Sequence, residues 1–272
     1  MTSALPLPTE IPASIGVFDS GVGGLSVLRA LHTRLPAAPL HYLADSAYAP
    51  YGDRSADEVI ARCGLLTEHL RAQGARMIVV ACNTATTLAI GSLRQRWPDL
   101  PFVGVEPGVK PAVAISRNRR IGVMATRRTI GSERLRSLVK EHAADCEVVL
   151  QACPGLADAI ETGRLDDAQM RTLLRTHCEP LAAAGVDTVV FGCTHYPFVA
   201  DTLQSLLGPQ VRLIDTAEAV AQRAEAVWQG LGLPPGANGL RLETTGDPLV
   251  LSVLARRWLG VTTEARRVTI GG

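Results

Sequence analysis

Lysine is scarce in this chain of 272 residues: Lys110 and Lys140 are its only lysines, and all other basic side chains are arginines. Pyridoxal-phosphate enzymes hold their cofactor as a Schiff base with a lysine. Lys140 lies in a charged helical pattern and Lys110 follows a proline-bounded turn, so neither favours that role. The six cysteines contain no C-x-x-C pair of the kind that binds metal. The sequence therefore predicts no cofactor and no metal.

A dominant charge and long apolar runs are also missing. The net charge is +1, which predicts no general attraction to nucleic acid or to an anionic membrane. No apolar run approaches the ~20 residues of a membrane span. Residues 1–12 lack the basic start and apolar centre of a secretory signal, and we expect them to form a flexible tail. In a chain large enough to build its own core, scattered cysteines indicate free thiols in the reducing cytoplasm.

Short apolar segments alternate with longer helical patterns, which indicates an α/β protein with mainly parallel strands. The predicted strands are Ile15–Phe18, Leu40–Leu43, Met77–Val80, Phe102–Val105, Ile121–Met124, Val148–Leu150, Thr188–Phe191 and Val211–Ile214. The predicted helices between them are Gly24–Leu35, Ala56–Gln73, Thr86–Arg96, Ser132–His142, Asp166–Ala184 and Tyr196–Leu207.

The chain repeats itself weakly but in matching order. The segment IGVF at 15–18 resembles IGVM at 121–124, and MIVVAC at 77–82 resembles TVVFGC at 188–193. Apolar strands look alike by chance, but a cysteine at the same strand end in both copies argues against coincidence. The sequence therefore predicts two similar, doubly wound, mainly parallel α/β domains that face each other across a cleft.

The repeat also divides the chain. We expect the first domain to comprise residues 13–103 and 216–272, and the second to comprise residues 104–215. The segment beyond residue 215 contains two further helical patterns and a strand near Leu240–Thr244. It should pack back on the first domain, because alone it is too small to build a core.

Chemically active side chains follow several of the predicted strands, at the sheet edge where parallel α/β proteins bind ligands. The glycine-rich turn from Asp19 to Gly24 exposes N–H groups that suit a carboxylate or a phosphate. Cys82 and Cys193 each leave a strand and open a helix, whose dipole favours the thiolate. Free cysteines are more often small apolar core residues, but the equivalent positions of these two favour a function.

Two domains that face each other would place Cys82 and Cys193 on opposite walls of one cleft. Inversion of a stereocentre by deprotonation needs a base on one face and an acid on the other. A thiolate and a thiol meet that need, since an ordinary cysteine pKa of ~8.5 lets both forms be reached near neutral pH. The pattern therefore predicts a two-base racemase.

Four segments together resemble the signatures of glutamate racemases, within the aspartate/glutamate racemase superfamily. They are residues 19–24 (DSGVGG), 42–45 with 50–52 (YLAD and PYG), 81–85 (ACNTA) and 192–197 (GCTHYP). The resemblance implies interconversion of L- and D-glutamate without pyridoxal phosphate or metal, and supply of D-glutamate for peptidoglycan. It leaves the oligomeric state open, a homodimer included.

The same resemblance implies roles for individual residues. Cys82 and Cys193 become the acid/base pair, Asp19 attends Cys82, His195 attends Cys193, and Asp45 and Glu161 are supporting ionisable groups. Glu161 carries over although the stretch after Cys153 departs from the family pattern. The implied substrate-binding residues are Asp19, Ser20, Tyr51, Gly52, Asn83, Thr84, Thr194 and His195, extended by Thr126 and Thr129.

Other interpretations stay open at this point. Asp19 and Asp45 fit turn-forming residues, His195 fits a hydrogen-bonded core histidine, and a zinc ion could recruit His195 with the two cysteines, although their spacing is unusual for zinc. An aspartate racemase of the same superfamily shares part of the motifs. Two α/β lobes around a cleft also describe a small-molecule-binding protein without catalytic activity.

Overall fold

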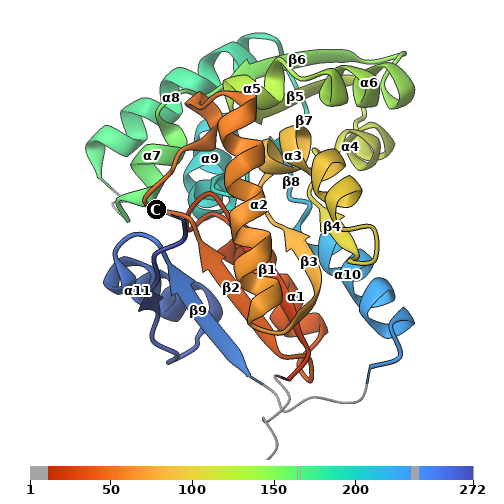
Figure 1. The fold of residues 1–272 in the computed structure, drawn as a ribbon. Helices are drawn as coiled ribbons and strands as arrows, with labels where there is room; N and C mark the ends of the chain where they lie inside the picture. Colours follow the sequence, from red (N-terminus) through yellow and green to blue (C-terminus); the bar gives the residue numbers. More distant parts are fainter. Residues whose placement is uncertain (1–11, 164, 166, 234–238, 272) are drawn as a thin grey trace, which may run out of the picture.

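The structure is a computed structural model that describes residues 12–163, 165, 167–233 and 239–271. Of the predicted flexible tail, residues 1–11 lie outside the described residues. The chain forms two separate sheets, one above the other in Figure 1, and every strand pair in them is parallel. The predicted α/β class with two parallel sheets is confirmed. No helix of the described residues combines the length and the apolar composition that would let it cross a membrane.

The larger sheet has six strands in the order β10-β9-β2-β1-β3-β4. Its strands are β1 (Ser14–Asp19), β2 (Leu40–Ala44), β3 (Ala75–Val80), β4 (Phe102–Gly104), β9 (Leu240–Thr244) and β10 (Arg266–Arg267). The central strands β1 and β2 are buried along their whole length. Burial on both faces explains why they read as continuous apolar runs rather than as alternating ones.

The smaller sheet has four strands in the order β6-β5-β7-β8. Its strands are β5 (Arg120–Ala125), β6 (Glu147–Ala152), β7 (Thr188–Gly192) and β8 (Arg212–Ile214). Counted within each unit, β2-β1-β3-β4 and β6-β5-β7-β8 follow the same order, second-first-third-fourth. The repeat predicted from the sequence is therefore a repeat of topology, and Cys82 and Cys193 both follow the third strand of their unit.

Helices cover both faces of each sheet. The longer ones are α1 (Leu25–Arg34), α2 (Ala56–Ala72), α3 (Asn83–Arg96), α6 (Glu133–His142), α8 (Ala168–Ala183), α9 (Ala200–Leu207), α10 (Ala217–Gly230) and α11 (Pro248–Leu259). The shorter ones are α4 (Val109–Ile115), α5 (Arg127–Ile130) and α7 (Leu156–Glu161), with 3-10 helices at Tyr51–Asp53 and Tyr196–Val199. Helices α2 and α3 pack on one face of the larger sheet, and α1, α10 and α11 on the other. On the smaller sheet, α4 and α6 cover one face and α8 the other.

The eight strands and six helices predicted up to residue 214 all exist, with differences at their ends, as do the strand and the two helices predicted beyond residue 215. The helix predicted at Tyr196–Leu207 begins as a 3-10 turn before α9, and residue 166 of the helix predicted at 166–184 lies outside the described residues. The sequence analysis missed α4, α5 and α7. Each has seven residues or fewer, too short for a helical period to emerge.

The C-terminal segment packs on the larger sheet and on α1. Strand β9 pairs with β2 from Leu40 to Ala44, β10 pairs with β9, and α10 and α11 pack on α1. We keep the division into residues 13–103 plus 216–272 and residues 104–215 as a proposal about domains.

A tight contact at the centre of β1 yields the first testable prediction. A Cβ atom added at Gly16 would lie 2.7 Å from Ile78 Cδ1 and 3.0 Å from Ala75 Cβ, all in the core. We expect Gly16→Ala to lower the free energy of unfolding by about 1–3 kcal/mol through overpacking. Gly91, inside α3, has nothing within 4 Å of an added Cβ. Gly91→Ala should instead raise the free energy of unfolding by ~0.5–1 kcal/mol. Urea denaturation measures both, and a neutral Gly16→Ala would contradict the packing described.

Candidate active site

A small cavity lies between the two sheets, where the loops that follow their first and third strands meet. Its volume is about 20 Å³, close to that of one water molecule. The residues that line it come from both units: Ser20, Pro50, Tyr51, Gly52, Cys82, Asn83, Thr84, Thr126, Ala157, Cys193, Thr194 and His195. The structure thus brings both predicted cysteines to one cavity.

Cys82 caps the N-terminus of α3. Its Sγ accepts a hydrogen bond from the Ala85 backbone N–H at 3.4 Å and donates one to Ser20 Oγ at 3.6 Å. Burial raises the pKa of the Cys82 thiol to about 12, and the nearby Asp19 carboxylate adds to the increase. The hydrogen bonds from Ala85 and Ser20 oppose the shift by stabilising the thiolate. Without a further positive charge, Cys82 is therefore a thiol.

Cys193 lies beside a buried histidine. Its Sγ is 3.6 Å from His195 Nδ1, and His195 Nε2 is 2.5 Å from Glu161 Oε1. Burial alone would lower the pKa of His195, but the contacts with Cys193 and Glu161 outweigh it and raise that pKa well above its usual value. The ring is therefore protonated, and both nitrogens donate. The two cavity thiols therefore have different neighbours, a backbone N–H and a hydroxyl at Cys82 and an imidazole at Cys193.

Asp19 is fully buried at the end of β1 and joins the two units. Its Oδ1 accepts from the Gly21 N–H at 2.8 Å, and its Oδ2 accepts from Thr194 Oγ1 at 2.9 Å. Burial raises the pKa of Asp19 to about 6, although the charge of His195 and these hydrogen bonds pull it down. Asp19 does not line the cavity; it holds Thr194 and contacts Ser20 (3.3 Å), which do.

The glycine-rich turn after β1 packs directly on His195 and Glu161 of the other unit. An added Cβ at Gly21 would overlap the Glu161 carboxylate at 1.8 Å, and one at Gly23 would lie 2.3 Å from His195 Nδ1. The Val22 N–H between them donates to Glu161 Oε1 at 2.7 Å. The turn therefore needs glycine for close approach, and its amide binds a carboxylate of the protein itself.

Asp45, after β2, forms a separate buried group. Arg62 of α2 pairs with both carboxylate oxygens of Asp45, at 2.7 and 2.8 Å, and Thr245 donates to Oδ1 at 2.9 Å. The Tyr51 hydroxyl donates to Asp45 Oδ2 at 2.5 Å, and Tyr51 lines the cavity. Asp45 therefore reaches the cavity only through Tyr51.

Polar groups of α3 and α5 complete the wall. Thr84 Oγ1 lies 3.0 Å from Thr126 Oγ1, and Thr126 bonds Thr129 in turn at 3.2 Å, so Thr129 supports Thr126 from outside the cavity. Gly52 lies against the Thr126 side chain. Asn83 Oδ1 is buried and makes no hydrogen bond within the described part of the chain. An acceptor with no partner in a cavity wall is available to a ligand that donates.

Comparison with known proteins decides the family. Residues 15–224 match the family model described as Asp/Glu/Hydantoin racemase. The chain belongs to this racemase family. It is 51% identical over 238 residues to the glutamate racemase of Ectopseudomonas mendocina (strain ymp), which covers 86% of this chain and 90% of the relative. As a member of the family the chain is an isomerase.

Solved racemase structures share the fold over almost the whole chain. A glutamate racemase isoform from Bacillus anthracis superposes with a TM-score of 0.84 at 33% identity, covering 94% of this chain and 97% of that one. The Escherichia coli glutamate racemase, in complex with L-glutamate and the activator UDP-MurNAc-ala, superposes with a TM-score of 0.86 at 27% identity. That match covers 96% of this chain and 100% of the other.

Three residues near the cavity were not predicted as site residues from the sequence: Arg62, Tyr196 and Cys153. Arg62, the partner of Asp45, lies in the middle of α2 with no motif around it. Tyr196 is fully buried, and its hydroxyl lies beside Cys153 and Cys193. Burial raises the pKa of the Cys153 thiol to about 12. A signal did exist for Cys153, which follows β6, the strand equivalent to the one before Asp45.

The raised pKa of Asp19 predicts that ionisation of this carboxyl lowers the free energy of unfolding. An asparagine at this position does not ionise and would remove that loss. Since the folded-state pKa is about 6 against an ordinary 3.8, folding favours the protonated carboxyl, and stability is lost as pH rises from about 4 through 6. We expect Asp19→Asn to gain up to about 3 kcal/mol relative to the wild type over that interval. Chemical denaturation at several pH values measures the difference. The exposed Asp99→Asn is the control, and parallel curves for Asp19→Asn and wild type would refute the assignment.

Proposed function

We propose that this racemase interconverts L- and D-glutamate, with Cys82 and Cys193 exchanging the Cα proton on opposite faces of the substrate. The observation that carries the proposal is that two thiols from equivalent strand ends of a repeated unit line one cavity. The choice of glutamate rests on relatives that bear the name glutamate racemase and on a structural neighbour that binds L-glutamate.

The two thiols exchange one proton with the substrate. In one direction Cys193 removes the Cα proton, while the C–H electron pair stays on the substrate. Cys82 begins as the thiol and donates its proton to the opposite face, becoming a thiolate. The reverse reaction starts from the exchanged protonation states, so each cysteine acts as a base for one enantiomer.

Substrate groups have defined partners in this proposal. The free Asn83 Oδ1 accepts from the substrate ammonium group, whose positive charge also favours the thiolate at Cys82. The hydroxyls of Ser20, Thr84, Thr126 and Thr194, with backbone N–H groups, donate to the two carboxylates. Asp19, Glu161 and Asp45 are positioning residues, because each acts through a side chain that lines the cavity.

Binding requires the cavity to widen. A volume of about 20 Å³ holds one water molecule but not an amino acid with two carboxylates. The contacts that close it between the units are few: the Thr84–Thr126 pair and the approach of Gly52 to Thr126. We infer that the two sheets separate at this side to admit glutamate and close again to exclude water.

The proposed product defines a cellular role. D-glutamate is supplied to peptidoglycan synthesis in the cytoplasm, which agrees with the described cysteines, all of them free thiols. Assembly as a homodimer is part of the same proposal, and size-exclusion chromatography with light scattering tests it.

Each cavity cysteine should be essential for racemisation. A serine hydroxyl is far less acidic than a thiol and cannot supply the base, so we expect Cys82→Ser and Cys193→Ser each to lower kcat by at least about 10³-fold. Circular dichroism of D- and L-glutamate with purified protein measures the rate. The matched control is Cys178→Ser, another buried cysteine outside the cavity, which should keep racemisation.

The two variants should differ in handedness. A glutamate analogue with a leaving group on the β-carbon needs only proton removal before it eliminates irreversibly. Each variant retains one cysteine that can act as the base. We expect one variant to eliminate from one enantiomer and the other variant from the opposite enantiomer. Chiral chromatography of the remaining analogue measures this. Elimination from the same enantiomer by both variants, or full racemisation by either, would show that the thiols are not opposed.

Glutamate should be strongly preferred over aspartate. A site whose donors pair the distal carboxylate of glutamate leaves them unpaired when the side chain is one methylene shorter. We expect kcat/KM for glutamate to exceed that for aspartate by at least about 100-fold. Comparable turnover of aspartate would change the substrate assignment and leave the two-thiol mechanism intact.

A further inference from the structure

A second polar cluster lies on the face of the larger sheet that α2 covers, and none of its residues lines the small cavity. It consists of His41 on β2, His69 on α2 and Glu243 on β9. One oxygen of Glu243, Oε2, lies 2.6 Å from His69 Nε2 and 2.9 Å from His41 Nε2. The imidazole rings of the two histidines lie edge to face, with 6.1 Å between their centroids. Three potential ligand atoms from three elements thus converge on one point.

His41 is the unusual member of this cluster. Its side chain is 3% exposed, yet within the described part of the chain neither ring nitrogen makes a hydrogen bond. Nε2 lies 2.9 Å from Glu243 Oε2 as an ion-pair contact, and Nδ1 has no partner within the described residues. Two imidazole nitrogens and one carboxylate oxygen thus converge in the interior, and a cation that all three share would satisfy them.

We propose that His41, His69 and Glu243 bind a divalent transition-metal ion of the zinc class. Two imidazole nitrogens and one carboxylate oxygen form a ligand set that zinc uses with an open fourth position, and imidazole suits zinc, cobalt and nickel alike. Bonds of about 2.0–2.2 Å in a tetrahedron set ligand atoms about 3.4 Å apart. The two contacts of Glu243 Oε2 therefore need to lengthen by less than about 1 Å to accept the ion, and all three atoms already lie within 4.8 Å of one another.

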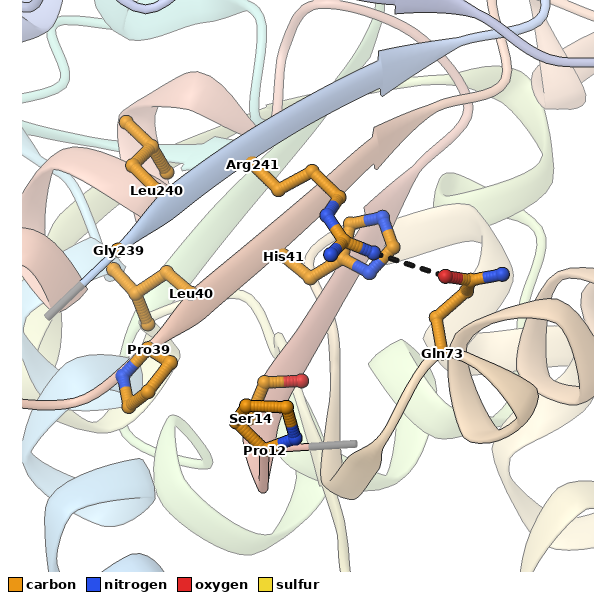
Figure 2. A pocket seen from close by; sticks show the side chains of 9 residues that line it. All are labelled: Pro12, Ser14, Pro39, Leu40, His41, Gln73, Gly239, Leu240 and Arg241. Atoms are coloured by element: carbon orange, nitrogen blue, oxygen red, sulfur yellow. Dashed lines mark hydrogen bonds between the residues drawn. The ribbon is translucent and has the colours of Figure 1, made fainter. Parts of the chain in front are cut away.

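A cavity borders His41, one of the three proposed ligands. It has a volume of about 250 Å³ and lies at the amino edge of the larger sheet (Figure 2). Ser14, whose buried hydroxyl also makes no hydrogen bond within the described residues, lines it with His41. The guanidinium of Arg241, on the neighbouring strand, is hydrogen-bonded to Gln73 at 3.0 Å (Figure 2). Of the three proposed ligands, His41 is the one that this cavity reaches.

The ion would have a structural role. It would join α2, β2 and the C-terminal strand β9, which lies about 200 residues from β2 in sequence but beside it in the sheet. Metal that binds only the folded chain raises its stability by mass action. The site is separate from the cysteines, so this inference does not depend on the racemase mechanism.

Cobalt(II) is the probe, because its absorption spectrum distinguishes the ligands. We expect the full-length chain near pH 7.5 to bind one equivalent of Co²⁺ without a thiolate charge-transfer band, and to gain thermal stability with increasing Co²⁺. Loss of a group that merely supports a ligand already costs 10–100-fold in affinity. His69→Ala and Glu243→Gln should therefore each weaken binding by at least about 100-fold.

A matched histidine serves as the control. The side chain of His142 is 22% exposed, as is that of His69, and it lies beside a glutamate too, Glu141 at 3.6 Å. His142→Ala should bind cobalt like the wild type. His69 lies on a helix surface, so His69→Ala keeps the fold even if Glu243→Gln does not, and far-UV circular dichroism verifies both. The proposal is overturned if the wild type binds no cobalt, if both variants bind it unchanged, or if a thiolate band places the ion on the cysteines.

Discussion

The arrangement of the site depends on one close contact between the two units. The glycine-rich turn after β1 meets Glu161 and His195 at distances that no side chain on the turn would permit. Through that contact the Val22 amide fixes Glu161, Glu161 fixes the His195 ring, and the ring lies against Cys193. The hydrogen bond from Thr194 to Asp19 ties the same two loops together. One glycine-rich turn therefore positions the imidazole that contacts a thiol of the other sheet.

The repeated topology makes the two thiols equivalent in position, and their neighbours make them unequal in chemistry. Cys82 has backbone and hydroxyl partners and lies near a carboxylate, so burial keeps it protonated. Cys193 has the His195 imidazole beside it, at 3.6 Å. Equivalent strands thus end in loops with different side chains, because fold and site vary independently.

The sequence predicted what depends on local pattern and could not predict what depends on distant pairing. Continuous apolar runs gave the strands, and cysteines at equivalent strand ends pointed to the cavity. Glu161 forms a hydrogen bond with His195, and Arg62 pairs with Asp45. No local sequence pattern shows which of these side chains will meet in the fold. The contact of His41 with Glu243 is not predictable for the same reason. A polar residue inside a buried strand interrupts the apolar pattern, and its partner is known only once the sheet order is known.

The C-terminal segment connects the fold's stability to the cavity wall. Strand β9 brings Thr245 to Asp45, and the chain after β10 brings the Ile270 carbonyl to Arg62. Both contacts hold the carboxylate that accepts the Tyr51 hydroxyl, and Tyr51 lines the cavity. A segment too small to form its own core thus supports a residue of the site about 200 positions earlier. Displacement of β9 from β2 would expose a buried ion pair and release Tyr51 together, since a buried carboxylate keeps its position only while its partners remain.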